Sequence, residues 1–181
     1  MSWSGRGAGR SNCAMARIRK RIVGVMFQGK LLAIAIARQA KGPMERVESV
    51  EVVMGEGLRG DRYGAGIGAA QFKGRRKPEN EVTLIAREAI EAANDEFNYT
   101  IEHLETRRNL LAEGVPLNEL VGKTFRVGAV VLKGLELCEP CGYLEKRTFA
   151  GIKAALARRG GLRCCVVEGG EICVGDVVSG D

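Results

Sequence analysis

The chain has little histidine and no long hydrophobic stretch. His103 is the one histidine among 181 residues, and no apolar run approaches the roughly 18 residues that a membrane-spanning helix needs. A His-ligated metal centre or a histidine-based catalytic triad is therefore a poor explanation of the chain, and we expect His103 to lie at the surface. Because no secretory apolar segment precedes the six cysteines, we expect free thiols in a reducing, cytoplasmic compartment, and no membrane partner.

Acidic residues are absent from the first 21 residues, which carry six of the 28 lysines and arginines. This leaves 22 basic residues against 22 acidic ones, so the net charge of +6 lies wholly in the N-terminal segment. A neutral body argues against a nucleic-acid-binding protein, which needs a basic face. It leaves open a local basic pocket for a small phosphate.

Residues 1–20 are rich in glycine, serine and arginine, and their apolar residues show little periodicity. We expect them to form a disordered basic tail. An over-extended start, with Met15 as the true first residue, accounts for them equally well. Residues 21–181 are long enough for a single domain with one core and short for two.

Short apolar and β-branched runs dominate the body of the chain. They predict strands within residues 22–27, 31–37, 47–54, 81–85, 124–127, 129–137, 162–167 and 172–178. Helical spacing marks residues 86–97 and the region around 149–156. Strands and helices do not alternate regularly, which disfavours a doubly wound parallel sheet. The pattern predicts a mostly β fold of the α+β class, a partly closed antiparallel β-barrel with covering helices.

Turn signals divide these strands. Gln28-Gly29 predicts a turn between the first two runs, and residues 168–171 predict the turn of a C-terminal hairpin. A longer loop begins at Gly55, carries Arg59 and Arg62, and continues through a glycine-rich and then basic stretch to Asn80. A loop of that length predicts either a mobile lid over a site or a disordered segment.

Cys141 follows the strand predicted over residues 129–137. Pro140 cannot donate a hydrogen bond to a strand ladder and also restricts Glu139, so the strand should end before it. Gly142 then allows the chain to turn. The thiol of Cys141 is thus expected in a bend just past a strand end, where it can face a cleft. A small buried hydrophobic role is the alternative.

The other cysteines do not predict a metal site. Adjacent Cys164 and Cys165 would point to opposite faces of one strand, and no second C-x-x-C motif joins Cys138 and Cys141 in a zinc site. A thioredoxin-like pair is also disfavoured because a strand, and not a helix N-terminus, is expected at Cys138. We expect Cys164, Cys165 and Cys173 to be core residues.

Six stretches occur together in the order and spacing of one known family. They are residues 57–63, 82–85, 107–110, 125–128, 139–141 and 174–178. On these stretches the chain resembles the MOSC domain family, whose members are homologous to the C-terminal part of molybdenum-cofactor sulfurase. It is similar to the stand-alone prokaryotic type over residues 30–178. The resemblance implies a β-barrel, and either a molybdenum–pterin cofactor site or sulfur handling through one cysteine.

The resemblance also assigns individual residues. In relatives such as the mitochondrial amidoxime-reducing component, the second cysteine of a C-x-x-C binds molybdenum, and Cys141 matches that position. Glu139 and Pro140 stand where those relatives carry smaller or basic residues. The cofactor-binding positions of the family match these residues: Arg38 (loosely), Lys41, Arg62, Arg107 and Asn109. Soft thiolate suits molybdenum, and arginine forks suit a cofactor phosphate.

The function implied by the resemblance is therefore a molybdenum-cofactor-binding protein with Cys141 as the metal ligand. It would reduce N-hydroxylated compounds with electrons from a donor protein. One alternative is a sulfur carrier that takes sulfur from a donor protein and delivers a Cys141 persulfide for metal–sulfur centre assembly. Another is a non-catalytic cofactor carrier or adaptor domain. We expect no nucleic-acid partner.

Overall fold

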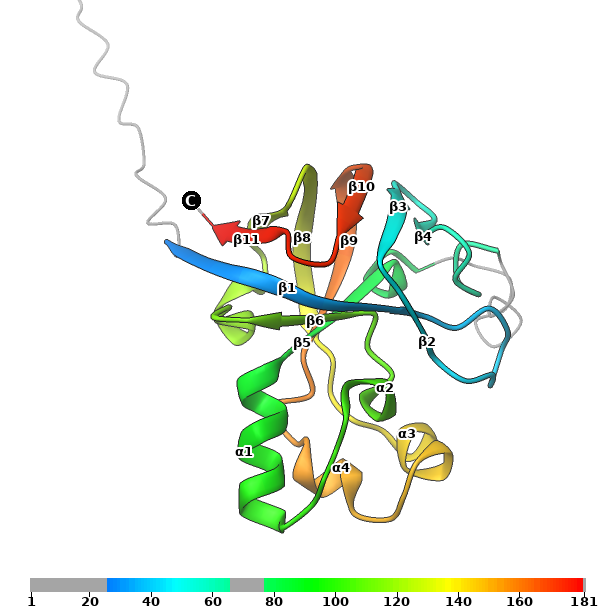
Figure 1. The fold of residues 1–181 in the computed structure, drawn as a ribbon, viewed down its shortest axis with the longest axis vertical. Helices are drawn as coiled ribbons and strands as arrows, with labels where there is room; N and C mark the ends of the chain where they lie inside the picture. The colour runs from blue at the N-terminus through cyan, green and yellow to red at the C-terminus, as the bar shows by residue number, and fades with distance from the viewer. Residues whose placement is uncertain (1–25, 66–76, 181) are drawn as a thin grey trace, which may run out of the picture.

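The structure, a computed structural model, describes residues 26–65 and 77–180. The predicted tail at residues 1–20 lies outside these ranges, as do residues 66–76 of the predicted loop. A disordered tail and a lid therefore stay predictions. In the described part, strands form a barrel and the helices α1, α3 and α4 gather at one end of it (Figure 1).

Seven strands close into the barrel. An eight-stranded sheet runs in the order β11-β7-β8-β9-β5-β6-β1-β2, and the additional pairing of β11 with β1 closes the ring. The strands are β1 (Phe27–Ile36), β2 (Glu45–Val47), β5 (Val82–Ala86), β6 (Leu110–Glu113), β7 (Thr124–Val127), β8 (Val130–Leu137), β9 (Leu162–Glu168) and β11 (Val177–Gly180). Among these described strands β5 and β6 are parallel, and the other neighbours are antiparallel. The predicted mostly antiparallel barrel is confirmed, and its ring is complete.

Strand β1 closes the ring because it is 10 residues long and pairs with different strands along its length. Its first part pairs with β11, and its later part pairs with β6 and β2. The expected turn at Gln28 and Gly29 is wrong, since the strand runs through both residues. A side chain at Gly29 would collide with the Glu113 carbonyl and Val115, so this glycine serves close packing.

Apolar side chains from all the ring strands fill the barrel. Each ring strand contributes at least one buried apolar side chain: Leu31, Leu84, Leu110, Phe125, Leu132, Leu162 and Val178. Removing such side chains from water is the main favourable term in folding. Successive side chains of a β-strand point to opposite faces of the sheet. Along each strand, every second residue therefore faces the barrel interior and its neighbours face outward.

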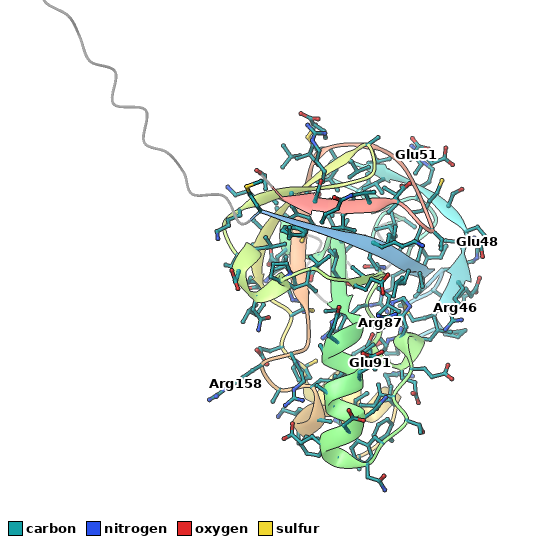
Figure 2. All side chains as sticks on the ribbon, turned by 60° about the vertical axis from the view of Figure 1, so that its left-hand side comes forward. Arg46, Glu48, Glu51, Arg87, Glu91 and Arg158 are labelled. Atoms are coloured by element: carbon teal, nitrogen blue, oxygen red, sulfur yellow. The ribbon has the colours of Figure 1, made fainter. Side chains whose placement is uncertain are left out.

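The helices build a second, smaller core. They are α1 (Arg87–Phe97), α2 (His103–Thr106), α3 (Gly142–Arg147) and α4 (Ile152–Ala155), with 3-10 helices η2 (Pro78–Asn80) and η3 (Leu117–Leu120). Helix α1 appears where its spacing predicted it, and Asn98 ends it in a left-handed conformation. Its apolar face packs on Leu144, Ile152 and Leu156. Arg87 and Glu91 pair 3.3 Å apart on its solvent side (Figure 2).

The helix predicted around residues 149–156 is only the four-residue α4, with α3 before it. None of the helices within residues 26–65 and 77–180 combines the length and the apolar character that crossing a membrane requires. The longest, α1, carries charged residues along its exposed side. Its role in the described structure is to cover the barrel end.

The predicted C-terminal hairpin is wrong. Strand β9 pairs with β8 and β5 inside the barrel, whereas β10 (Gly170–Cys173) leaves the barrel and pairs with β3 (Ser49–Val53). With β4 (Gly57–Leu58) they form a separate sheet in the order β10-β3-β4. Pairing with β3 brings Ile172 opposite Val50, and both are buried. Long-range burial thus outweighs the local turn signal.

The prediction that Cys164, Cys165 and Cys173 are core residues is only partly right. Cys164 is fully buried inside the barrel, while Cys165, on the opposite face of the same strand, is partly exposed. Cys173 is exposed, because its neighbour Ile172 takes the inward position of β10. The strand alternation that places Cys164 and Ile172 inside places their neighbours outside.

His103 lies in the interior, so the expected surface position is wrong. A capping box of Glu102 and Glu105 starts α2, and the imidazole that follows is only 3% exposed. Burial lowers the pKa of His103 to about 4, the backbone at Arg108 opposes the shift, and the charge of Arg46 adds to it. The imidazole is therefore neutral in the folded protein near neutral pH.

The buried imidazole predicts a specific loss of stability in acid. The unfolded chain binds a proton near the ordinary pKa of 6.5, but the folded chain binds it only near 4. Stability from this group is complete above about pH 6.5 and falls by about 3 kcal/mol as pH drops to about 4. Urea unfolding of the parent and of His103→Leu at both pH values measures it. An equal pH-dependent loss in both proteins would contradict the prediction.

Gly161 predicts a second stability effect. Its φ is +102°, and a Cβ there would overlap the carbonyl oxygen of Leu84 in the barrel wall. Gly175 has a matching φ of +100° but open space around it. Gly161→Ala should therefore lower the free energy of unfolding by roughly 3 kcal/mol or more, against roughly 1 kcal/mol for Gly175→Ala. Similar losses in urea unfolding would show that backbone conformation alone matters at Gly161.

Candidate functional site

A cavity of about 360 Å³ lies where six separate segments meet. Its walls come from residues 40–44, 61–63, 80–83, 107–109 just before β6, 138–144, and Arg163 on β9. Five cations line it against two carboxylates, namely Lys41, Arg62, Arg107, Arg108 and Arg163 against Asp61 and Glu139. The cavity therefore favours an anionic ligand.

Arg108 connects three backbone segments that border this cavity. Its buried guanidinium donates from Nε to the carbonyl of Gly160 at 2.7 Å, from Nη1 to Thr106 at 2.9 Å and from Nη2 to Cys138 at 2.7 Å. Burial lowers the pKa of Arg108, and no carboxylate pairs with it among the described residues. Three segments are thus held together by one cation, and each of its three nitrogens donates one hydrogen bond.

Cys141 lies at the rim of the cavity, exposed, while Cys138 is buried beneath it. The strand before them ends at Leu137, as the Pro140 argument predicts. Cys141 then forms the N-cap of α3, and its carbonyl accepts from the backbone of Leu144 at 3.0 Å. The short helix after Cys141 is a feature that the sequence reasoning missed.

Arg107 also lines the cavity. It is the C-cap of α2, with a φ of +56°. Burial lowers the pKa of Arg107, and the neighbouring charge of Arg62 lowers it further, while Tyr143 and Asp61 oppose the shift. Its Nε and Nη2 are shielded from solvent and have no hydrogen-bond partner among the described residues. A guanidinium with two buried nitrogens that lack hydrogen-bond partners favours the binding of an anionic ligand.

The carboxylate of Asp61 accepts hydrogen bonds from backbone N–H groups and forms no ion pair with these arginines among the described residues. It accepts from the N–H of Ala37 at 2.8 Å and from the N–H of Tyr63 at 2.9 Å. The N–H of Arg62 donates to the carbonyl of Ala37 at 2.7 Å. Asp61 thereby anchors the loop that carries Arg62 to the end of β1.

The side chain of Asn109 forms hydrogen bonds that stabilise the fold. Its side-chain oxygen accepts from the backbone and the hydroxyl of Thr83, and its Nδ2 donates to the carbonyl of Ala35 at 3.2 Å. These contacts join β1, β5 and β6 directly below the cavity. One Nδ2 hydrogen is left for a ligand.

The structure brings together most of the residues that the sequence suggested. The cavity is lined by Lys41, Arg62, Arg107, Asn109 and Cys141. Arg38 is not among the lining residues, and its exposed guanidinium pairs with Glu45 at 2.9 Å. The sequence reasoning missed Arg108, Tyr143 and Arg163 as lining residues. A cation inside the apolar run of β9 was the available signal for Arg163.

The charged groups around the cavity fall into two sets according to which arginine they lie near. Arg62, Tyr143, Arg147 and Asp61 act on Arg107, and we call this set the guanidinium end. Cys138, Arg163, Cys141 and Glu139 act on Arg108, and we call this set the thiol end. A ligand that reaches both ends needs an anionic group at one and a group that binds soft sulfur at the other.

Comparison with known proteins identifies the family. The sequence pattern of the MOSC domain matches residues 58–179. The chain belongs to the MOSC domain family. The resemblance noted from six short stretches is therefore confirmed. No curated protein matches this MOSC protein.

Solved structures share the fold of this MOSC protein. The YuaD protein from Bacillus subtilis is 16% identical with a TM-score of 0.71, and the match covers 87% of this chain and 97% of that one. YiiM from Geobacillus stearothermophilus is 13% identical with a TM-score of 0.63, covering 83% and 74%. YiiM from Escherichia coli is 16% identical with a TM-score of 0.57, covering 84% and 69%. At these identities the likeness establishes the fold.

The contacts of Arg108 predict a large stability effect. Arg108→Lys keeps the charge but cannot reach three carbonyls in fixed directions, so buried carbonyls lose their donors. We expect the free energy of unfolding to fall by about 2–4 kcal/mol. Urea unfolding measures it, with exposed Arg126→Lys on β7 as the control, expected within about 0.5 kcal/mol of the parent. Parent-like stability of Arg108→Lys would rule out the three-carbonyl contact as a major stabiliser.

Proposed function

We propose that this MOSC protein binds a molybdenum–pterin cofactor in the cavity and reduces N-hydroxylated compounds, with Cys141 as the molybdenum ligand. The observation that carries the proposal is the state of Arg107. Two of its nitrogens are buried without partners in the described structure, beside a cavity that also holds an accessible thiol. An anionic ligand with a thiophilic metal supplies what both groups lack.

The lining residues fit such a cofactor at both ends. Arg107 and Arg62 would hold the phosphate, with Lys41 at the edge of the same cavity. The remaining Nδ2 hydrogen of Asn109 would donate to the pterin. The thiol of Cys141 would bind the metal. When bound, the cofactor would supply a metal centre that exchanges two electrons with the substrate.

The protein's own residues would position these parts. Arg108 holds the segment that carries Cys141 at a fixed place relative to Arg107. Asp61 and Asn109 tie the other walls to the barrel. Electrons would come from a donor protein. The five cysteines of the described residues are all free thiols, which suits a reducing cytoplasmic compartment.

Sulfur transfer is a second candidate, favoured by the exposure of Cys141 at the rim. A donor protein that itself carries a persulfide could reach this thiol. The Cys141 thiolate would take the outer sulfur, which leaves a persulfide on Cys141 and a thiolate on the donor, with Arg108 nearby. The buried Cys138 could not be reached in the same way. The two candidates differ in what Cys141 carries, a metal or one additional sulfur atom.

Replacing Cys141 tests both candidates. Protein made in a molybdenum-replete host should contain molybdenum, and Cys141→Ser should reduce the content at least about tenfold, since even outer-shell changes weaken metal sites by that factor. Elemental analysis measures molybdenum, and mass spectrometry detects a persulfide on Cys141. Thermal unfolding should be close to that of the parent, because Cys141 is exposed.

Cys173→Ser is the matched control, because Cys173 is also exposed but lies outside the cavity. It should keep the parent's molybdenum content. A persulfide on Cys141 without molybdenum would favour the sulfur carrier. Equal molybdenum and persulfide content in parent and Cys141→Ser would contradict both candidates.

A further inference from the structure

The thiol end of the cavity holds positive charge that a cofactor phosphate at the guanidinium end would not use. Arg108 and Arg163 both act on this end, and Arg163 also lowers the pKa of Arg108 after the larger effect of burial. Each of the three nitrogens of buried Arg108 already donates to a backbone carbonyl. Arg163 is the cation that remains able to bind a ligand there.

Arg163 is held in place with part of its guanidinium unused. Its Nη1 donates to the side chain of Asn80, and its Nε lies 3.4 Å from the carboxylate of Glu136. Nη2 has no partner within residues 26–65 and 77–180. The side chain is 28% exposed and lines the cavity, so a small molecule can reach it. Two fixed nitrogens orient the third toward a ligand.

The carboxylates at this end already have partners. Glu139, a lining residue, accepts from the backbone N–H of Arg158 at 3.1 Å, in the segment whose Arg158 side chain extends into solvent (Figure 2). Glu136 is 59% exposed, is not among the lining residues, and pairs with Nε of Arg163 at 3.4 Å, an exposed ion pair of the kind that water weakens. This pair leaves Nη2 of Arg163 to an anion that enters the cavity.

We propose that the thiol end is an anion subsite for the substrate, and that Arg163 binds an oxyanion group of that substrate beside Cys141. The substrate class is a small molecule that carries a carboxylate or a phosphate. This inference rests on the proposed function for the reaction at Cys141, but the charge preference belongs to the protein alone. It makes Arg163 a residue that determines specificity.

Two alkylating reagents of different charge test the subsite in metal-free protein. Iodoacetate is an anion and iodoacetamide is neutral, and in both reactions the Cys141 thiolate forms a carbon–sulfur bond and displaces iodide. The ratio of the two rates cancels the thiolate fraction, so it reports only the preference for the anion. Residue-resolved mass spectrometry measures this ratio at Cys141 and at Cys173, which lies beside Glu171 and Asp176.

The ratio of iodoacetate to iodoacetamide rates should be higher at Cys141 than at Cys173. Arg163→Gln should lower it roughly threefold to tenfold at Cys141, the effect of one unit charge acting over about 4 Å at a dielectric close to that of bulk water. Arg163→Lys should keep most of the preference. The ratio cancels any change in the thiolate fraction that the loss of this charge causes. Thermal unfolding close to that of the parent shows that the fold of Arg163→Gln is intact.

Control variants separate this subsite from the rest of the cavity. Arg126→Gln removes an exposed arginine on β7, outside the cavity, and should leave the ratio unchanged. Arg107→Gln should lower it less than Arg163→Gln does. A larger effect of Arg107→Gln, or no effect of Arg163→Gln, would overturn the assignment to Arg163.

Competition distinguishes the two oxyanions. Acetate, inorganic phosphate and neutral acetamide are compared at equal ionic strength for slowing the iodoacetate reaction at Cys141. Slowing by acetate assigns a carboxylate substrate, and slowing by phosphate alone assigns a phosphate substrate. No slowing by either anion overturns the subsite. Molybdenum content does not enter these measurements, so their failure is distinct from failure of the proposed function.

Discussion

The guanidinium of Arg108 is the constraint on which the site depends. It joins the end of α2, the segment after β8 and the segment before β9 through carbonyls of Thr106, Cys138 and Gly160. These segments are far apart in sequence, and the barrel order alone does not set their spacing. A buried cation with three carbonyl acceptors is costly to disturb, because any change leaves polar groups unpaired. The position of Cys141 follows from this contact.

Two adjacent arginines take opposite roles because the backbone turns between them. Arg107 ends α2 in the left-handed conformation and faces the cavity. Arg108 begins the approach to β6 and points into the protein. Every nitrogen of the Arg108 guanidinium has a partner within the described structure, whereas two nitrogens of Arg107 have none there. The two adjacent arginines therefore differ in role: Arg108 stabilises the structure, and Arg107 is available to bind a ligand.

The closed barrel supplies the rigid frame for these groups. Strand β1 pairs at both ends of its length, and Asn109 connects it to β5 just below the cavity. Loops that leave a rigid frame can present charged groups in fixed positions. In this MOSC protein such segments carry Arg62 and Arg107 at the guanidinium end, while strand β9 itself carries Arg163 at the thiol end. The separation of these sets supports a ligand anchored at one end and a charged substrate at the other.

The sequence by itself determined the barrel class, helix α1, the strand end before Cys141 and most of the lining residues. Those features depend on local period, on Pro140 and on motif order. Tertiary structure alone decided the partner of β10, the interior position of His103 and the roles of Arg108 and Arg163. Each of these depends on which distant segments pack together, through burial and buried hydrogen bonds. A local pattern can indicate that a residue is polar or apolar, but its neighbours across the fold decide what it contacts.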